Sequence, residues 1–432
     1  MRTRAIFACL LFLAGSGSAS ASTLTYDHVL KGGVAQSYDL KLAKTDAKLA
    51  NNDIKQARVA YMPIVRLTSN TEYQYGFTGN NAQVQAVSNV ILPTGTRFQG
   101  AATFNTTYTL CDFGVRGNSL RAAKSHASAM SYQMNAQSRD LKIKLTDLYC
   151  DALSNWKALK AKQRVLALYQ QLFDAKKRLH EAGNVSKVDV MEQSIKVAQT
   201  LDDINVCKQK LSNDLQNLAE YTHECYDPES TEIADFVDEP IVFSRFEPEA
   251  TPEFKYYDLE LERKRAELKS IKAQRLPQIG MYSNYVWYGS DKYNPWNVPG
   301  NFGQRTLSMG FSLNWNVFDG FKNAAERERV SLEIERLKTE RDQKVWALRK
   351  QADKTFVDAD LYKVQMSTKA EIVSKRDTKS SAYKRLVDRQ VTDKTGWLSE
   401  QAQLAEHQLD LDKADILKRA AQLKLNILAT MY

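Results

Sequence analysis

Apolar and polar residues alternate with a period of two in four stretches of the chain, at residues 64–77, 98–110, 278–287 and 306–317. Alternation over about ten residues predicts β-strands that each have one apolar and one polar face. The apolar faces are rich in aromatic residues, such as Tyr285 and Trp287. The polar positions that we expect to line a lumen are Arg66, Asn70, Glu72, Asn105, Thr107, Asn284, Asn314 and Asn316.

Long segments with apolar residues at near-heptad spacing predict helices. One helix is expected over residues 115–182, which contain no proline, and it would be roughly 100 Å long at 1.5 Å per residue. A second follows it, and a matching pair is expected over residues 321–388 and 392–431. The apolar stripe indicates packing against neighbouring helices, and the charged opposite faces suit a solvated surface.

The order helix, strand, strand, long helix, turn, long helix occurs twice. Pro63 and Pro277 are 214 residues apart, and Asp112 and Asp319 are 207 apart. At the turn between the long helices we match residues 183–186 with residues 389–392, an offset of 206. A repeat of this length indicates a duplicated domain. We expect a first copy at 22–226, an acidic connector with prolines at 227–253, and a second copy at 254–432.

The N-terminus has the pattern of a secretory signal peptide over residues 1–21. Two arginines precede an apolar run at residues 5–14, and small residues follow at Ala19 and Ala21. The alternative is a short buried helix. No cysteine stands at the cleavage point, so we expect the exported chain to carry no lipid.

The mature chain keeps four cysteines. They are Cys111, Cys150, Cys207 and Cys225. We expect small buried or lumenal residues rather than a disulfide framework. Cys207 and Cys225 fall on one predicted helix, where they would be roughly 27 Å apart.

The strands fit a membrane protein better than a soluble one. The alternative is a soluble β-sandwich, in which the polar face of each sheet is solvated. No apolar run reaches the length of about 18 residues that a membrane-spanning helix needs. The strands are long, their apolar faces are aromatic, and the chain is exported. Because four strands cannot close a barrel and open edges are not tolerated in lipid, several chains must share one. The sequence does not choose between two and three chains.

The charge pattern and the motifs favour neither nucleic-acid binding nor catalysis. The formal net charge is +9, but the signs alternate along the chain. We find no nucleophile elbow, P-loop or zinc-binding motif, and the five histidines are scattered. We therefore expect no enzyme activity, no cofactor and no metal site.

Three short motifs, in their order and repetition, resemble the TolC family of outer-membrane efflux and secretion channels. They are the helix ends at Met62-Pro63 and Leu276-Pro277, the strand exits Asp112–Gly114 and Phe318–Gly320, and the helix turn Ala182–Val190. The resemblance implies a mainly α homotrimer, in which an α-barrel of long antiparallel helices joins a shared twelve-strand β-barrel in the outer membrane of a Gram-negative bacterium.

By the same resemblance, the trimer is a passive exit duct in outer-membrane lipid. A periplasmic adaptor would connect it to an inner-membrane pump of the ABC, RND or MFS type. The adaptor would dock at the helix turns, formed here by Gly183, Asn184, Val185, Ser186, Gln390, Val391 and Thr392. The resemblance does not separate efflux from type I secretion. A periplasmic structural coiled-coil protein is the rival function, although it leaves the strands unexplained.

The sequence departs from the family at the periplasmic entrance. Family members narrow it with acidic residues after the second turn, and our alignment places Thr395 and Leu398 at those positions. Asp189 has an ordinary alternative role as a helix-start carboxylate. The candidate gate residues are Asp189, Glu192, Asp393, Thr395 and Leu398.

Overall fold

The computed structural model describes residues 23–74, 97–237 and 247–429. The predicted signal peptide lies outside these residues, as does part of the predicted connector. The chain divides into two compact units. We call one the helical unit, which takes Met1–Ala43, Met134–Pro252 and Val345–Tyr432, and the other the sheet unit, which takes Lys44–Gln133 and Glu253–Lys344.

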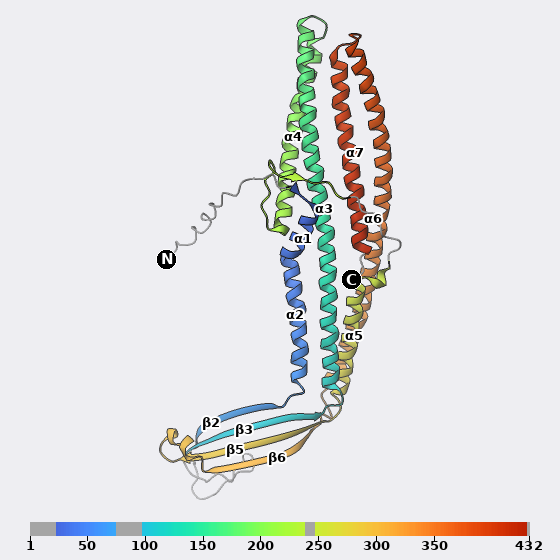
Figure 1. Ribbon diagram of the computed structural model, residues 1–432. Coiled ribbons are helices and arrows are strands. Elements are labelled where there is room, and N and C mark those ends of the chain that lie inside the picture. The colour runs from blue at the N-terminus through green and yellow to red at the C-terminus, as the bar shows by residue number, and fades with distance from the viewer. Residues whose placement is uncertain (1–22, 75–96, 238–246, 430–432) are drawn as a thin grey trace. The chain divides into compact units, whose positions relative to one another are not determined.

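The sheet unit contains one four-stranded antiparallel sheet (Figure 1). Its strands, in spatial order, are β2 (Ile64–Gln74), β3 (Arg97–Cys111), β5 (Gln278–Asp291) and β6 (Gln304–Asn314). The central pair β3–β5 joins the two halves of the chain, and β2 and β6 are the edges. All four strands were predicted from the alternation. In the fourth, regular pairing ends at Asn314, before the predicted end.

Two short helices lead into the first strand of each pair. They are the last part of α2 (Tyr38–Val59) and α5 (Pro252–Ala273). Each ends four residues before a proline, Pro63 or Pro277. A proline keeps the residue before it out of the helical region, and this turns the chain into a strand.

The long helices leave the sheet unit and continue through the helical unit. They are α3 (Val115–Glu181) and α6 (Lys322–Asp388), and each is followed by a returning helix, α4 (Lys187–Thr222) or α7 (Lys394–Ala429). Within the sheet unit, the Ser270 hydroxyl of α5 donates to the carbonyl of Val115 at the start of α3, over 3.1 Å. Lys264 of α5 forms an ion pair with Glu333 of α6, over 2.6 Å.

The core of the helical unit lies between α3, α4, α7 and α1 (Tyr26–Gln36). The fully buried residues of this core include Leu145, Leu153, Leu211, Leu215 and Leu218, most of which belong to the predicted stripes. Two short strands, β1 (Thr23–Leu24) and β4 (Glu232–Ile233), pair in parallel beside it. Mutual burial of these stripes holds the hairpin together.

Tyr149 of α3 ties this short sheet to the core. Its hydroxyl lies 3.0 Å from the carbonyl oxygen of Leu24 and 2.7 Å from that of Ala234, so its proton can be donated to either. Its ring meets the ring of Phe236 edge to face, with centroids 5.1 Å apart. Burial raises the pKa of the Tyr149 hydroxyl well above its ordinary value, and the nearby Asp235 carboxylate adds to the increase.

The duplication is confirmed to the residue in the helices. The helices α3 and α6 have 67 residues each, and α2 and α5 have 22 each; α4 has 36 residues, and α7 has 36 within the described part of the chain. Matching helices after the strands are offset by 207 residues, and α2 and α5 by 214. The compact units cut across the copies, because each unit takes segments from both halves of the chain.

The cysteine expectation is correct in part. All four mature cysteines are free thiols, and Cys150 is buried. Cys225, however, is exposed and lies beyond the end of α4 at Thr222, so it does not share a helix with Cys207. The αL conformation of His223, with φ of 57°, ends the helix there. Among the described residues, no helix is long and apolar enough to cross a membrane.

Candidate functional site

The polar side chains of the four strands share one face of the sheet. Cross-strand register places Arg66 opposite Asn105, Asn105 opposite Asn284, and Asn284 opposite Ser308, so one polar row runs across all four strands. The side-chain amide of Asn105 donates to the amide oxygen of Asn284. Directly opposed residues lie on the same face of a sheet. The predicted strand residues that this register places on the polar face are Arg66, Asn70, Glu72, Asn105, Thr107, Asn284 and Asn314.

The polar face is hollowed. A cavity of about 390 Å³ lies over it, and its lining includes Asn70, Glu72, Asn105 and Asn284. Asn316 is not part of this face, because β6 ends at Asn314. It lines a different cavity, at the junction between strand and helix.

The opposite face is apolar, and many of its side chains are exposed among the described residues. Along β6, Leu307, Met309, Phe311 and Leu313 are all exposed, while the polar residues between them are half-buried. On the neighbouring strand, Tyr285 and Trp287 contact each other edge to face at 4.5 Å between ring centroids. A continuous apolar face of this kind requires an apolar partner, such as lipid or another protein.

A β-bulge changes the face of one predicted residue. Strict alternation places Leu110 on the apolar face, but the register shifts between Thr109 and Cys111, and Cys111 lies opposite Ile279 instead. The extra residue of a bulge flips the alternation beyond it. Cys111 is therefore a half-buried residue of the apolar face, not a lumenal one.

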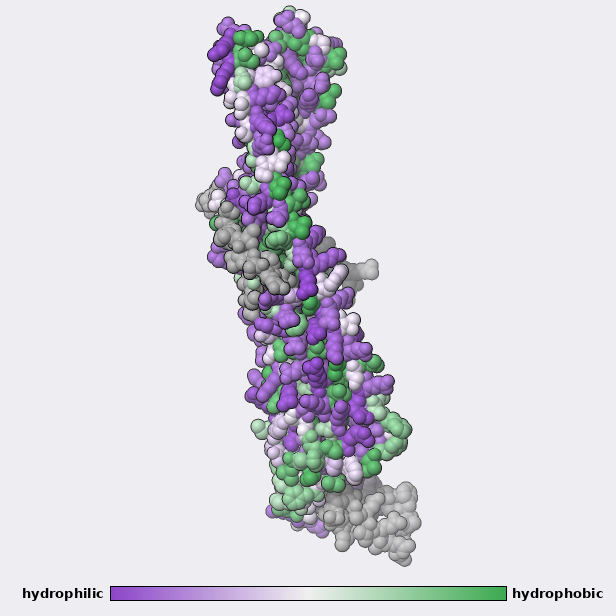
Figure 2. Space-filling model, turned by 90° about the vertical axis from the view of Figure 1, so that its right-hand side faces the viewer, coloured by the Kyte–Doolittle hydropathy of each residue, from purple (hydrophilic) through white to green (hydrophobic). Residues whose placement is uncertain are grey.

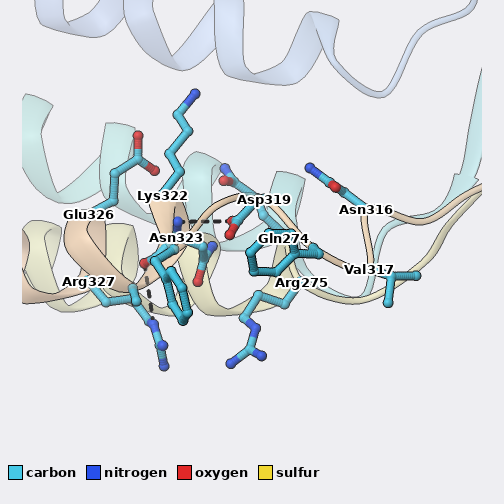
Figure 3. Close-up of a pocket in the computed structure, with 12 residues that line it drawn as sticks. Gln274, Arg275, Asn316, Val317, Asp319, Lys322, Asn323, Glu326 and Arg327 are labelled. Atoms are coloured by element: carbon cyan, nitrogen blue, oxygen red, sulfur yellow. Dashed lines mark hydrogen bonds between the residues drawn. The ribbon is translucent and has the colours of Figure 1, made fainter.

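Both strand exits are built around an aspartate. The backbone N–H of Arg116 donates to Asp112 Oδ2 over 2.8 Å, and that of Asn323 donates to Asp319 Oδ2 over 2.9 Å (Figure 3). In both copies the next two residues have positive φ, and the order of Phe and Gly is reversed between the copies. Burial raises the pKa of the Asp112 carboxyl, but backbone and guanidinium donors outweigh it and the pKa is lowered overall.

The strand–helix junction of the second copy contains a cavity of about 590 Å³. Figure 3 shows Arg275 and Arg327 extending to one side of it, and Lys322 and Glu326 to the other. Apolar side chains beside it are strongly exposed, including Trp315, Val317, Phe318 and Phe321. Apolar residues gather at this junction in the space-filling view (Figure 2). Aromatic residues at the ends of strands suit a membrane interface.

The two turns between long helices have the same backbone. The N–H groups of Gly183 and Asn184 donate to the carbonyls of His180 and Leu179, over 2.9 Å in each case. Gln390 and Val391 make the corresponding bonds, over 2.9 Å and 3.0 Å. The left-handed residue is Gly183 in one copy, with φ of 80°, and Gln390 in the other, with φ of 57°.

This geometry corrects the alignment of the second turn by one residue. Gln390, not Arg389, replaces the glycine, and the offset at the turn is 207 rather than 206. The positions that match Asp189 and Glu192 in the first copy are therefore Gly396 and Ser399. Neither has a carboxylate.

Each returning helix begins at a capped turn. Ser186 Oγ accepts from the N–H of Asp189 over 3.2 Å and donates to its carboxylate over 2.7 Å. In the second copy, Asp393 accepts from the N–H of Thr395 over 2.8 Å, and also from its hydroxyl. These capping bonds satisfy helix-end donors, so Asp189 and Asp393 have structural roles at the turns.

The other gate candidates are in different environments. Glu192 forms an exposed ion pair with Lys196, over 3.4 Å. Leu398 is only 2% exposed and packs inside the hairpin. The predicted gate residues are thus not one cluster.

Sequence reasoning missed an ionic cluster around a buried carboxylate on the second hairpin. The side chain of Glu400 on α7 is 5% exposed and accepts from Arg376 over 2.9 Å and from Lys379 over 2.8 Å, both on α6. Arg376 also donates to Gln403. Burial raises the pKa of the Glu400 carboxyl, but the bonds from Lys379 and Arg376 outweigh burial and the pKa is lowered overall.

The first copy has neutral residues at the same positions. With the offset of 207, Glu400 corresponds to Gln193, Arg376 to Tyr169 and Lys379 to Leu172. Gln193 is buried and donates to the carbonyl of Tyr169, over 3.3 Å. An alignment of the two copies by 207 residues would have shown this replacement of neutral residues by charges.

Comparison with known proteins gives one family match. Residues 33–222 match the family model described as outer membrane efflux protein. No curated protein matches the sequence.

Solved structures share the fold over most of the chain. One is a structure of CusC from work on its folding and transmembrane channel formation. It has a TM-score of 0.77 and 14% sequence identity, and the match covers 93% of this chain and 91% of the CusC chain. A membrane protein from Pseudomonas aeruginosa has a TM-score of 0.76 and 13% identity, covering 93% of each chain. The outer membrane protein VceC from Vibrio cholerae has a TM-score of 0.73 and 13% identity, covering 93% of this chain and 95% of its own.

Proposed function

The chain belongs to the outer membrane efflux protein family through residues 33–222, and we propose that it is the outer-membrane exit duct of a tripartite efflux or type I secretion system. In this role it passively conducts substrates from the periplasm to the exterior of a Gram-negative bacterium. The observation that carries the proposal is the four-stranded sheet, which has one polar hollowed face, one apolar exposed face and, among the described residues, two free edges.

The free edges require other chains. Among the described residues, strands β2 and β6 each pair on one side only, and unpaired backbone groups are too costly in lipid. Because the order along the sheet is antiparallel throughout, β6 of one copy can pair antiparallel with β2 of the next. A repeated contact between two different edges generates a closed ring if the rotation closes.

Three copies fit a duct better than two. A ring of two copies would have eight strands, and side chains fill the interior of a barrel of about eight strands. Three copies give twelve strands and a wider interior, into which the polar row from Arg66 to Ser308 would point. We therefore propose a homotrimer with Arg66, Asn70, Glu72, Asn105, Thr107, Asn284 and Asn314 lining its lumen.

The helices also have surfaces for neighbouring copies. Leu42 and Leu49 of α2 are exposed and seven residues apart, which places them on one face of the helix. On α6, Trp346 and Val357 are exposed as well. Apolar stripes on long helices are typical of helix-to-helix contacts.

The remaining parts of the proposal concern export and partners. The mature chain would begin after residue 21 and carry no lipid. The turns at residues 183–186 and 390–392 would dock a periplasmic adaptor, which links the duct to an inner-membrane pump. The capped, similar geometry of the two turns supports this assignment, because it presents two related surfaces per chain.

The test is the state of the purified protein. We expect extraction only with detergent, a complex with about three times the mass of the mature chain, and ion conductance when the complex is added to planar lipid bilayers. The rival periplasmic coiled-coil protein would be released without detergent and would not conduct. A monomer without conductance would contradict the duct.

A further inference from the structure

The segment between β5 and β6, residues 292–303, folds back onto the sheet. We call it the strap. It contains the short helices η2 (Pro295–Asn297) and η3 (Pro299–Asn301), at the end of the sheet away from α5 (Figure 1). Its central residue, Val298, is 0% exposed. The strap is therefore seated on the protein rather than extended into solvent.

Two glycines form the seat. Gly100 of β3 and Gly289 of β5 are direct register partners, so together they leave a notch in the sheet. A Cβ atom at Gly100 would lie 2.5 Å from Val298 Cγ1, and one at Gly289 would lie 2.5 Å from the Val298 carbonyl oxygen. Any side chain at either position would displace the strap.

The notch is on the apolar face. In β3, Gly100 alternates with Ala102 and Phe104, and in β5, Gly289 alternates with Trp287. The polar face, with its cavity, is on the other side of the sheet. The strap consequently covers the outside of the proposed barrel and does not form a lid over its lumen.

The strap displays two aromatic side chains on a fixed backbone. The Asp291 carboxylate accepts from the N–H groups of Tyr293 and Asn294, over 2.8 Å and 2.7 Å. The Asn294 side chain accepts from the N–H of Trp296, over 2.9 Å. Tyr293 is 81% exposed and Trp296 is 87% exposed. Such exposure is unusual for aromatic residues in water.

We propose that the strap is a lipid anchor, whose Tyr293 and Trp296 rings enter the headgroup region of the lipid around the barrel. The inference rests on the proposed function, which places the sheet in a membrane. Trp and Tyr favour the interface because one part of each ring is apolar and another forms hydrogen bonds. The strap continues the apolar face at the end of the strands, where a lipid interface is expected.

Fluorescence quenching in lipid vesicles tests the anchor. The emission of Trp296 is obtained as the difference between the wild-type protein and Trp296→Phe, both in phosphatidylcholine vesicles. Lipids brominated on the acyl chain near the headgroup should remove most of this emission, whereas acrylamide in the water should remove little. The matched control is Trp346→Phe on α6, whose difference emission brominated lipid should leave unchanged.

Two further variants test the seat. Gly289→Val fills the notch and should make the Trp296 emission sensitive to acrylamide, whereas Gly300→Ala in the same strap should not, because nothing lies within 4 Å of that position. Quenching of Trp296 by acrylamide alone in the wild-type protein would overturn the anchor, whether or not Gly289→Val folds. Conductance measured on the same protein distinguishes failure of the anchor from failure of the proposed duct. A protein that conducts but has a water-exposed Trp296 contradicts only the anchor.

Discussion

The contact between neighbouring copies should have the register of the β3–β5 pair inside the chain. The β2–β3 pair, with Ile64 opposite Thr107, and the β5–β6 pair, with Gln278 opposite Asn314, have the same register once the offsets of 214 and 207 are applied. The sheet therefore repeats to the residue. If the six hairpins of a twelve-strand ring all contact their neighbours alike, the pair formed by β6 and the next β2 must follow the β3–β5 pattern.

The offsets give the pairing. Asn105 lies opposite Asn284 within the chain. Adding 207 to residue 105 of β3 gives Ser312, the equivalent position on β6. Subtracting 214 from residue 284 of β5 gives Asn70, the equivalent position on β2. Both positions are on the polar face, as the pairing requires. Directly opposed Cβ atoms in an antiparallel pair are about 4.5–5.5 Å apart, close to the roughly 3.5–4.5 Å of a disulfide.

Oxidative crosslinking measures this register. The double variant Asn70→Cys with Ser312→Cys, in a chain whose four mature cysteines are replaced by serine, should form disulfides between copies and give a three-chain band on a non-reducing gel. A disulfide within one chain is excluded, because the two edge strands are separated by three strand spacings of about 4.8 Å. The control, Glu72→Cys with Ser312→Cys, is diagonal at about 7–8 Å and should crosslink poorly. Efficient crosslinking of the control and not of the Asn70 pair would refute the reasoning.

Four other predictions follow from the structure. Met309, the middle residue of β6, is 70% exposed on the apolar face, and Met309→Arg should destabilise each chain in lipid by about 2–4 kcal/mol, far more than Ser308→Arg on the polar face. Equal denaturant midpoints in vesicles for these two variants would contradict the face assignment. Glu400→Gln should lower stability at pH 7 by about 1–2 kcal/mol, because it weakens two charge-assisted bonds to partly exposed cations. The pKa of Glu400 is lowered from 4.5 by folding, so its contribution is present above pH 4.5, and denaturation of wild type and variant should converge as the pH falls through the folded-state pKa. Gln390→Gly should raise the unfolding temperature, since a non-glycine αL residue costs about 1–2 kcal/mol, whereas Gly183→Ala should lower it. A trivalent cation on the periplasmic side should no longer block single-channel conductance when the carboxylates of Asp189, Glu192 and Asp393 are neutralised together. Block that survives this change would place the gate elsewhere.

Most of the fold follows from periodicity in the sequence. The strands alternate over enough residues to fix their faces. The ends of the long helices that lie within the described residues differ by at most two residues from the prediction, and the predicted end of the last helix at residue 431 lies outside them. The errors occur where a single residue changes the geometry. A bulge at Leu110 leaves no mark in the alternation, because both neighbouring residues are acceptable on either face. Similarly, Gln390 has none of the conformational freedom by which a glycine signals an αL turn, so the alignment slipped by one residue.

The candidate site was less predictable, because it depends on residues that are distant in the sequence. The polar row was predictable, since each member belongs to an alternating strand. The partners of Glu400 were not, because Arg376 and Lys379 lie more than twenty residues away on another helix. Glycines at positions 100 and 289 were likewise uninformative until the register brought them together. Contacts between elements, rather than patterns within them, define these features.

The two copies have the same backbone but hold their hairpins by different forces. In the first copy, Leu172 and the neutral Gln193 are buried between the helices. In the second, Lys379 and Glu400 occupy the same positions and form an ion pair, in which the Glu400 carboxylate is buried and the Lys379 side chain is about half exposed. Removing the cations from the buried Glu400 carboxylate is costly because it leaves a buried charge unpaired, so the ion pair favours a single register of α7 on α6. Charge therefore specifies the second hairpin, and of these two clusters only the second contains a group that acid can neutralise.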